Sequence, residues 1–408
     1  MVRPSHLRGT LAIITPYWGE QESESVALVR LVAGALATAY QVEVIVLDEA
    51  ATAPSMALDS AFRIHRLPAP ADPRRQFALV GELLTRSGGD ASLPASITSI
   101  LFDTTTLTEP LREVLMTIDP ATILLIGTYH PYDLALLRTA SDRRILLLPI
   151  SEDRIDGADE RTGELLDLAD AVIAIHPGAE RALATRTTTP VVPLDLALTV
   201  NRNAMRDTLF GVRFYQPFVL LLRSFPGGTS HEATMATVTH EIITAVAGPV
   251  RREEIPEENW RYAYEEIPEI LPISVAEVNG ASWHLADERN LLPLPVNPSR
   301  VNLWRLMAHA LFLIDLRQPM PFGREAIESM LLGTPVIVPA TGAAREHVAA
   351  ADGGLWYRDN GELLDCVRVM TDRSIRDRLG RQGLAYATDH HGDVDAFVAR
   401  ICALALPA

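Results

Sequence analysis

The sequence predicts an α/β fold of two domains, each built on a parallel β-sheet that helices cover on both faces. The length of 408 residues suits two or three domains of ordinary size. A hydrophobic share of 48% is enough for well-buried cores and excludes a disordered chain. Short apolar runs alternate with helical patterns along the chain, as they do in parallel sheets that are buried on both faces.

The first half opens with a strand–loop–helix–strand unit, which is typical of a doubly wound, Rossmann-like sheet. The strands are expected at residues 11–15 and 42–47, and the helix at 24–39, where apolar residues recur at helical spacing. The loop contains one glycine, Gly19, where a dinucleotide-binding fingerprint has three, which argues against a dehydrogenase. Further elements are expected at residues 77–84, 99–102, 107–118, 123–126, 144–149, 163–168 and 171–175.

The second half follows a proline-containing connection at residues 187–217. A second sheet is expected to start with the strand at residues 218–222, and the last helix of the chain is expected at 394–405. Between them, further helices and strands are expected at residues 301–307, 311–316, 324–332, 336–338, 361–370 and 374–387.

The most informative stretch covers residues 321–339, where a tight glycine turn leads into a short helix and then into an apolar strand. Gly333 fits the left-handed position after a helix end. A glycine turn before a helix leaves free backbone N–H groups at the positive end of the helix dipole, where a phosphate can bind. Glu328, in the first turns of this helix, can accept hydrogen bonds from sugar hydroxyls. The alternative is an ordinary β-α-β connection with no ligand.

This stretch resembles the donor-site signature of family 4-type retaining glycosyltransferases with the GT-B fold. The resemblance implies two Rossmann-like domains that face each other across a cleft. It also implies hexosyl transfer from a nucleotide-sugar donor, a UDP- or GDP-sugar, to an unknown acceptor with retention, and without a metal or other cofactor. The matching residues are Phe322, Gly323, Glu328, Met330, Gly333, Thr334, Pro335 and Val336.

The resemblance also implies a division of the chain. Residues 1–190 are expected to form an acceptor domain, residues 191–385 a nucleotide-sugar domain, and residues 386–408 a helix that crosses back to the first domain. Arg223 and the N–H groups near Gly323 would stabilise the leaving diphosphate, and Glu328 would hold the ribose. The predicted catalytic residues are His130 and Glu328, and the predicted substrate-binding residues are Gly19, Glu20, Arg223, Phe322, Gly323, Arg324, Glu325 and Thr334.

Three positions depart from the family pattern. Met320 stands where a glutamate usually contacts the donor sugar, and Glu20 replaces a glycine of the first loop. A lysine that usually follows the arginine at position 223 is missing, and the whole sequence contains no lysine. These departures support an alternative, a catalytically impaired GT-B protein that acts as a binding or partner subunit.

Charge and composition exclude further classes of function. A net charge of −16 argues against nucleic acid as a partner, because phosphate backbones select basic surfaces. No stretch is long and apolar enough to span a bilayer, and the first apolar run is expected to be a strand rather than a signal peptide. Cys366 and Cys402 are expected to be reduced thiols, which with these features suggests a cytoplasmic protein. A homo- or hetero-oligomer remains open.

Overall fold

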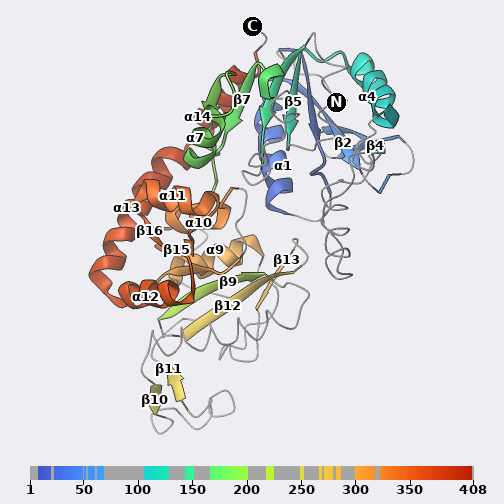
Figure 1. Ribbon diagram of the computed structural model, residues 1–408. Coiled ribbons are helices and arrows are strands. Elements are labelled where there is room, and N and C mark those ends of the chain that lie inside the picture. Colours follow the sequence, from blue (N-terminus) through green and yellow to red (C-terminus); the bar gives the residue numbers. More distant parts are fainter. Residues whose placement is uncertain are drawn as a thin grey trace, which may run out of the picture.

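The chain forms two α/β domains, which lie one above the other in Figure 1, a view of the computed structural model. The upper one, the first domain, contains an eight-stranded sheet, and the lower one, the second domain, contains a six-stranded sheet. The structure describes residues 8–19, 23–48, 50–51, 54–59, 62–68, 105–127, 143–150, 166–200, 217–224, 249–251, 266–268, 271–278, 282–285, 299–317 and 322–406.

The sheet of the first domain has the strand order β3-β4-β2-β1-β5-β6-β7-β8, and all its pairs are parallel except β3 with β4. In the central strand β1, Leu11 is in register with Val42 of β2 and Thr122 of β5. Central strands are buried on both faces, which explains their unbroken apolar runs. The strands are β1 (Thr10–Thr15), β2 (Gln41–Asp48), β3 (Ser55–Asp59), β4 (Phe62–Pro68), β5 (Thr122–Ile126), β6 (Arg144–Leu148), β7 (Ala171–Ala174) and β8 (Val191–Pro193).

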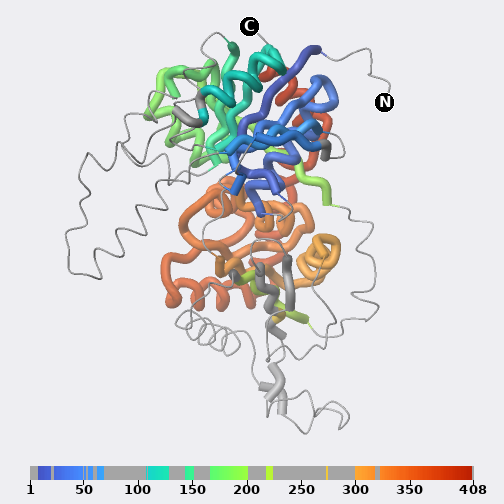
Figure 2. Tube along the Cα trace, turned by 90° about the vertical axis from the view of Figure 1, so that its right-hand side faces the viewer, coloured from blue at the N-terminus to red at the C-terminus, as the bar shows by residue number. Residues whose placement is uncertain are grey.

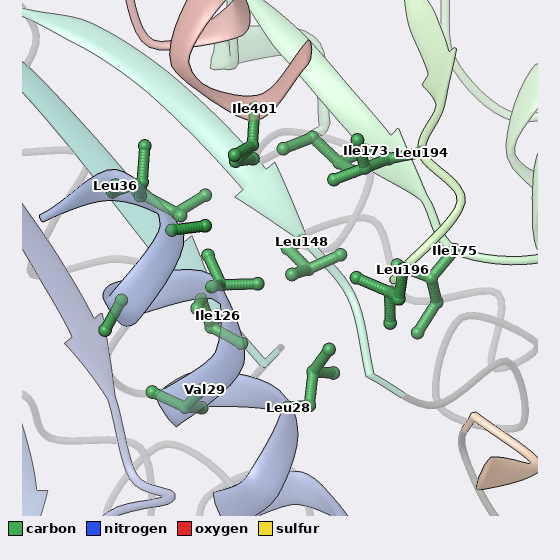
Figure 3. Close-up of a cluster of buried hydrophobic side chains, with 14 of the residues drawn as sticks. Leu28, Val29, Leu36, Ile126, Leu148, Ile173, Ile175, Leu194, Leu196 and Ile401 are labelled. Atoms are coloured by element: carbon green, nitrogen blue, oxygen red, sulfur yellow. The ribbon is translucent and has the colours of Figure 1, made fainter. Parts of the chain in front are cut away.

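The helices of the first domain are α1 (Glu24–Leu36), α4 (Thr105–Ile118) and α7 (Pro177–Ala184). Ser23 ends the loop after β1 and starts α1, because its hydroxyl oxygen accepts a hydrogen bond from the Val26 N–H at 3.2 Å. Side chains of α1 pack on one face of the sheet, and those of α4 and α7 pack on the other. Figure 3 shows the first of these cores, where Leu28 and Leu36 of α1 meet Ile126 and Leu148 of the sheet.

The sheet of the second domain has the strand order β13-β12-β9-β14-β15-β16, and β13 is its antiparallel edge strand. A separate antiparallel pair is formed by β10 and β11. The strands are β9 (Phe218–Ser224), β10 (Pro249–Arg251), β11 (Glu266–Pro268), β12 (Leu271–Val278), β13 (Ser282–Leu285), β14 (Leu313–Asp315), β15 (Val336–Pro339) and β16 (Gly354–Tyr357).

The C-terminal part of the chain crosses from the second domain to the first. Helix α14 packs against α1, and in Figures 1 and 2 the C-terminus lies at the top of the molecule with the first domain. Two hydrogen bonds fix this contact: Tyr40 Oη donates to the Cys402 carbonyl at 3.1 Å, and Thr122 Oγ1 donates to the Ala405 carbonyl at 3.0 Å. The described helices of this half are α9 (Arg300–His309), α10 (Arg324–Leu331), α11 (Ala343–Ala351), α12 (Asn360–Thr371), α13 (Arg373–His391) and α14 (Val394–Leu404).

The predicted fold class, two parallel-sheet α/β domains, is confirmed. The strands β3, β4, β8, β10, β11, β12 and β13 were not predicted. Prolines and charged residues interrupt the apolar pattern around them, and the pairs β3–β4, β10–β11 and β12–β13 are antiparallel. The elements expected at residues 77–84 and 99–102 lie outside the described residues. None of the described helices is long and apolar enough to cross a membrane.

Candidate functional site

The candidate site lies where the starts of α1 and α10 meet. Each helix follows the carboxyl end of a strand in the middle of its sheet, β1 for α1 and β14 for α10, and ligands of such sheets bind at these ends. Gly323, the residue before α10, has a left-handed φ of 68° and offers no side-chain cap. A Cβ atom at this position would lie 2.7 Å from the Cα and N atoms of Ala344, so only glycine fits between α10 and α11.

The carboxylate of Glu24, the first residue of α1, holds the start of α10. Its Oε2 accepts a hydrogen bond from the Phe322 N–H at 3.2 Å, and its Oε1 accepts one from the Arg324 N–H at 2.8 Å. These two N–H groups lie on either side of Gly323, at the start of α10, where backbone amides have no partner within the helix. The start of α10 therefore binds a carboxyl group, and that group belongs to the other domain of the same chain.

Next to this contact, three arginines and three carboxylates form what we call the α10 charge cluster: Arg300, Asp315, Arg317, Arg324, Glu325 and Glu328.

One part of the α10 charge cluster joins the end of β14 to the first turn of α10. Arg317 Nε and Nη2 donate to the two oxygens of Asp315 at 2.8 and 2.7 Å, and Nη2 also donates to Glu325 at 3.0 Å. Arg317 and Glu325 are 4% exposed, so this ion pair is almost fully removed from water. The contacts satisfy these buried charges and fix the segment that leads into α10.

The other part of the cluster holds Glu328, one of the predicted catalytic residues. Arg300, at the start of α9, donates through Nε to Glu328 Oε1 at 3.2 Å and through Nη2 to Oε2. Arg324 Nε donates to Glu328 Oε1 at 2.9 Å, one turn along the same helix. Glu328 is 1% exposed, so in this state its carboxylate binds two guanidinium groups in the protein interior.

Burial and charge act in opposite directions on the two acids at the α10 start. Burial and the neighbouring charge of Glu325 raise the pKa of Glu24 to about 7, although Arg317 and the two amide hydrogen bonds lower it in part. Burial also disfavours the charged form of Glu325, but Arg317 and Arg300 outweigh it and hold the pKa of that carboxyl well below its usual range. Of these two acids, Glu24 is therefore the one whose charged form the protein stabilises less.

The other predicted residues lie in several places. Gly19 lies in the loop before α1, and its carbonyl accepts a hydrogen bond from Arg30 Nη2 at 2.9 Å. Arg223 follows Leu222 in β9, and Leu222 is paired with Asp315 of β14, so Arg223 lies at the same sheet edge as the segment leading to α10. Thr334 is buried after α10, where its hydroxyl donates to the Met307 carbonyl at 2.7 Å.

The structure brings together Phe322, Gly323, Arg324, Glu325 and Glu328, which all belong to α10 and its turn. Their predicted roles toward a ligand stay predictions. His130, Glu20 and Met320 lie outside the described residues.

Sequence reasoning missed Glu24, Arg300, Asp315 and Arg317. Glu24 carries a weak signal, because it directly follows the loop that contains Gly19 and Glu20, two of the predicted substrate-binding residues. Arg300 carries no such signal, since its partners on α10 are more than twenty positions away in the sequence.

The two domains also meet at α7 and α11. Arg181 of α7 forms an ion pair with Glu346 of α11, and Arg345 contacts the same carboxylate. Beside this contact lies a histidine cluster, which we define as His176, His347, His390 and His391.

The rings of the histidine cluster lie close together at this domain contact. The ring centroids of His347 and His391 are 5.0 Å apart, and those of His347 and His176 are 6.1 Å apart. Burial is the main cause that lowers the pKa of His176, to about 4, and that of His347 and His391. Within the described part of the chain, no group of three or more His, Cys, Asp or Glu side chains is arranged to hold a metal ion.

Comparison with solved structures identifies the fold. A sucrose-phosphate synthase from Thermosynechococcus elongatus is similar over 97% of this chain and 98% of its own, with a TM-score of 0.61 and 15% identity. A trehalose-6-phosphate synthase studied for glycosyl transfer with retention is similar over 96% of this chain and 98% of its own, with a TM-score of 0.62 and 9% identity. An Anabaena protein in complex with UDP and glucose is similar over 97% and 98%, with a TM-score of 0.54 and 14% identity.

The similarity covers nearly the whole length of each of these chains, so both domains follow one architecture. That architecture is the GT-B fold. Neither the family models nor the curated proteins that were compared match the sequence.

Proposed function

We propose that the protein is a retaining glycosyltransferase that moves a hexose from a nucleotide sugar, a UDP- or GDP-sugar, to an acceptor. The observation that carries this proposal is the start of α10. Two backbone amides beside the left-handed Gly323 bind a carboxylate there, at the point that the sequence signature assigns to the donor diphosphate. An arrangement of amides that holds one oxyanion can hold a phosphate in the same way.

The whole-length similarity to sugar-nucleotide enzymes supports the proposal. Two of the similar structures are named as a sucrose-phosphate and a trehalose-6-phosphate synthase, and a third binds UDP and glucose. At 8–15% identity this likeness carries the fold, whereas the choice of donor and acceptor depends on the residues of this chain.

In the proposed mechanism the residues of the second domain stabilise the leaving nucleoside diphosphate. Negative charge grows on the diphosphate as the sugar bond breaks, and the amides of Phe322 and Arg324, the helix dipole and Arg223 would stabilise it. Glu328 would bind the ribose hydroxyls, and His130 would face the acceptor. Because Glu328 is buried in the described state, its contact with a ribose requires the surrounding ion pairs to open.

The proposed roles divide along the chain. Residues 1–190 would bind the acceptor, residues 191–385 the nucleotide sugar, and residues 386–408 would tie the two domains together. Closure of such domains over a donor excludes water and limits hydrolysis.

Calorimetric titration of the full chain with UDP, GDP and ADP tests the donor site. Arg223→Ala and Glu328→Ala are each expected to weaken binding of the preferred nucleotide about tenfold or more, the range for a lost charge-assisted hydrogen bond. Unchanged affinity in both variants would show that the site has been misplaced.

The alternative function is a GT-B protein that binds but does not transfer, and although the similar structures do not favour it, one observation makes it worth testing. The arginines of the α10 charge cluster already form ion pairs with buried carboxylates, and Glu24 already accepts hydrogen bonds at the start of α10. If nucleotide sugars bind but are neither hydrolysed nor transferred to any acceptor, the protein is a binding or partner subunit.

A further inference from the structure

The contact between Glu24 and the start of α10 has a consequence for ligand binding. It uses the two amides that a donor phosphate needs, those of Phe322 and Arg324. Glu24 is 7% exposed, so its carboxylate fills the space directly in front of the helix start. A phosphate and this carboxylate cannot occupy the same two amides at once.

The charges around Glu24 favour its replacement at the two amides by a more strongly charged anion. In the α10 charge cluster three guanidinium groups are matched by three carboxylates, and Glu24 adds a fourth carboxylate beside them. Burial and the charge of Glu325 disfavour ionisation of Glu24, which is why its pKa is raised. A diphosphate carries more negative charge and more acceptor oxygens than one carboxylate, so it competes well for the same amides.

The position of Glu24 in the chain allows it to leave. It belongs to α1 of the first domain, whereas the amides belong to the second domain, 298 and 300 positions later in the sequence. A small relative movement of the domains withdraws the carboxylate without breaking a strand or helix.

We propose that in the ligand-free protein the Glu24 carboxylate occupies the place of a donor phosphate at the start of α10, and that the nucleoside diphosphate displaces it when the donor binds. This inference rests on the proposed function, because it takes the α10 start to be the diphosphate site. Glu24 then links the two domains before donor binding and lowers the apparent affinity for the donor, since only the fraction of molecules with Glu24 withdrawn can bind it.

The test is a calorimetric titration of the full chain with two probes, UDP and inorganic pyrophosphate. The variants are Glu24→Ala, which removes the carboxylate, and Glu346→Gln as a matched control. Glu346 also joins the domains through its ion pair with Arg181, but it does not hold the amides of Phe322 and Arg324. If Glu24 occupies the helix start in 90–99% of molecules, Glu24→Ala binds both probes about 10- to 100-fold more tightly than the wild type. Glu346→Gln is expected to bind them with wild-type affinity.

The outcomes separate the inference from the proposed function. Equal UDP affinity in the wild type and Glu24→Ala overturns the inference and leaves the proposed function standing. An equal gain in Glu24→Ala and Glu346→Gln also overturns it, because general loosening of the domain contact then explains the gain. A gain for pyrophosphate without any nucleotide binding overturns the proposed function and with it displacement by a donor, and shows only that Glu24 occupies an anion site. No binding of either probe by any variant overturns both.

Thermal unfolding of each sample shows whether the variant is folded. If Glu24→Ala does not fold, Glu24→Asp provides the test instead. Aspartate is one methylene shorter, so it cannot reach both amides, and an affinity gain between those of the wild type and the alanine variant is expected. A folded Glu24→Asp protein without any gain overturns the inference.

Discussion

The guanidinium group of Arg300 binds both carboxylate oxygens of Glu328, and its Nη1 also donates to Glu325 at 2.6 Å. Arg300 therefore joins the start of α9 to two buried acids of α10. Within the α10 charge cluster, loss of Arg300 leaves Glu328 only Arg324 and Glu325 only Arg317 as ion-pair partners, so each buried carboxylate loses part of its compensating charge, which is destabilising.

Arg300→Met is expected to lower the free energy of unfolding by up to about 3 kcal/mol, measured by chemical denaturation. Arg368→Met is the control, because Arg368 and its partner Asp365 are both mostly exposed and such a surface pair contributes at most about 1 kcal/mol. The double variant Arg300→Met/Glu328→Gln is expected to regain part of the loss. Equal small losses in Arg300→Met and Arg368→Met would contradict the buried network.

Gly323 and Gly333 both have left-handed backbones, so the stabilities of their alanine variants can be compared directly. Gly323 has a φ of 68°, and a Cβ atom at this position would lie 2.7 Å from backbone atoms of Ala344. Gly333 has a φ of 81°, and a Cβ atom there would meet only Leu384 Cδ2, at 3.8 Å. Gly333→Ala is expected to cost about 1 kcal/mol of backbone strain. Gly323→Ala must also push α11 away, so a cost about 2 kcal/mol larger is expected. Equal unfolding free energies of the two variants would refute the close approach of α10 and α11.

The histidine cluster predicts a loss of stability in acid. The pKa of His176 is lowered to about 4 from an ordinary value of about 6.5, so the unfolded chain binds this proton first as the pH falls. The stability contributed by the neutral imidazole is complete above pH 6.5 and is lost between about pH 6.5 and 4, by up to about 3 kcal/mol.

His176→Asn tests this prediction without breaking the helix cap. The imidazole Nδ1 accepts a hydrogen bond from the Ala179 N–H at 3.1 Å, and an asparagine oxygen can accept the same bond. The unfolding free energy of the variant is expected to fall less between pH 6.5 and 4 than that of the wild type. Parallel pH profiles of the two proteins would show that His176 does not carry the effect.

The raised pKa of Glu24 predicts the opposite pH dependence of the unfolding free energy. Its pKa is raised to about 7 from 4.5, so the folded protein binds this proton where the unfolded chain does not. The stability linked to the protonated acid is complete below about pH 4.5 and is lost as the pH rises through 7. Arg317 and Glu325 are the charged groups that face this carboxylate from the second domain. Relative to the wild type, Glu24→Gln is expected to gain unfolding free energy between pH 4.5 and 8, and a constant difference would contradict the raised pKa.

The helices and buried strands around the site could be predicted from the sequence because their signals are local. Gly323 and Gly333 mark the two ends of α10, and the apolar run of Val336–Pro339 marks β15. The observed bounds differ from the predicted ones by only a few residues at each of these elements.

The occupant of the α10 start could not be predicted in this way. The bond from the Arg324 N–H to Glu24 joins residues 300 positions apart, and it exists only because two domains pack in one particular arrangement. The same is true of Arg300, whose contacts depend on how α9 packs against α10. Local patterns give the donors at the helix start, whereas the tertiary structure decides which anion they hold.

The central claim is tested most directly by turnover of a panel of UDP-, GDP- and ADP-sugars by the full chain, with product configuration determined by NMR. The account predicts release of a nucleoside diphosphate from at least one donor and a product that keeps the anomeric configuration of the donor sugar. A folded protein that releases no nucleoside diphosphate from any donor, or whose product has inverted configuration, would contradict it.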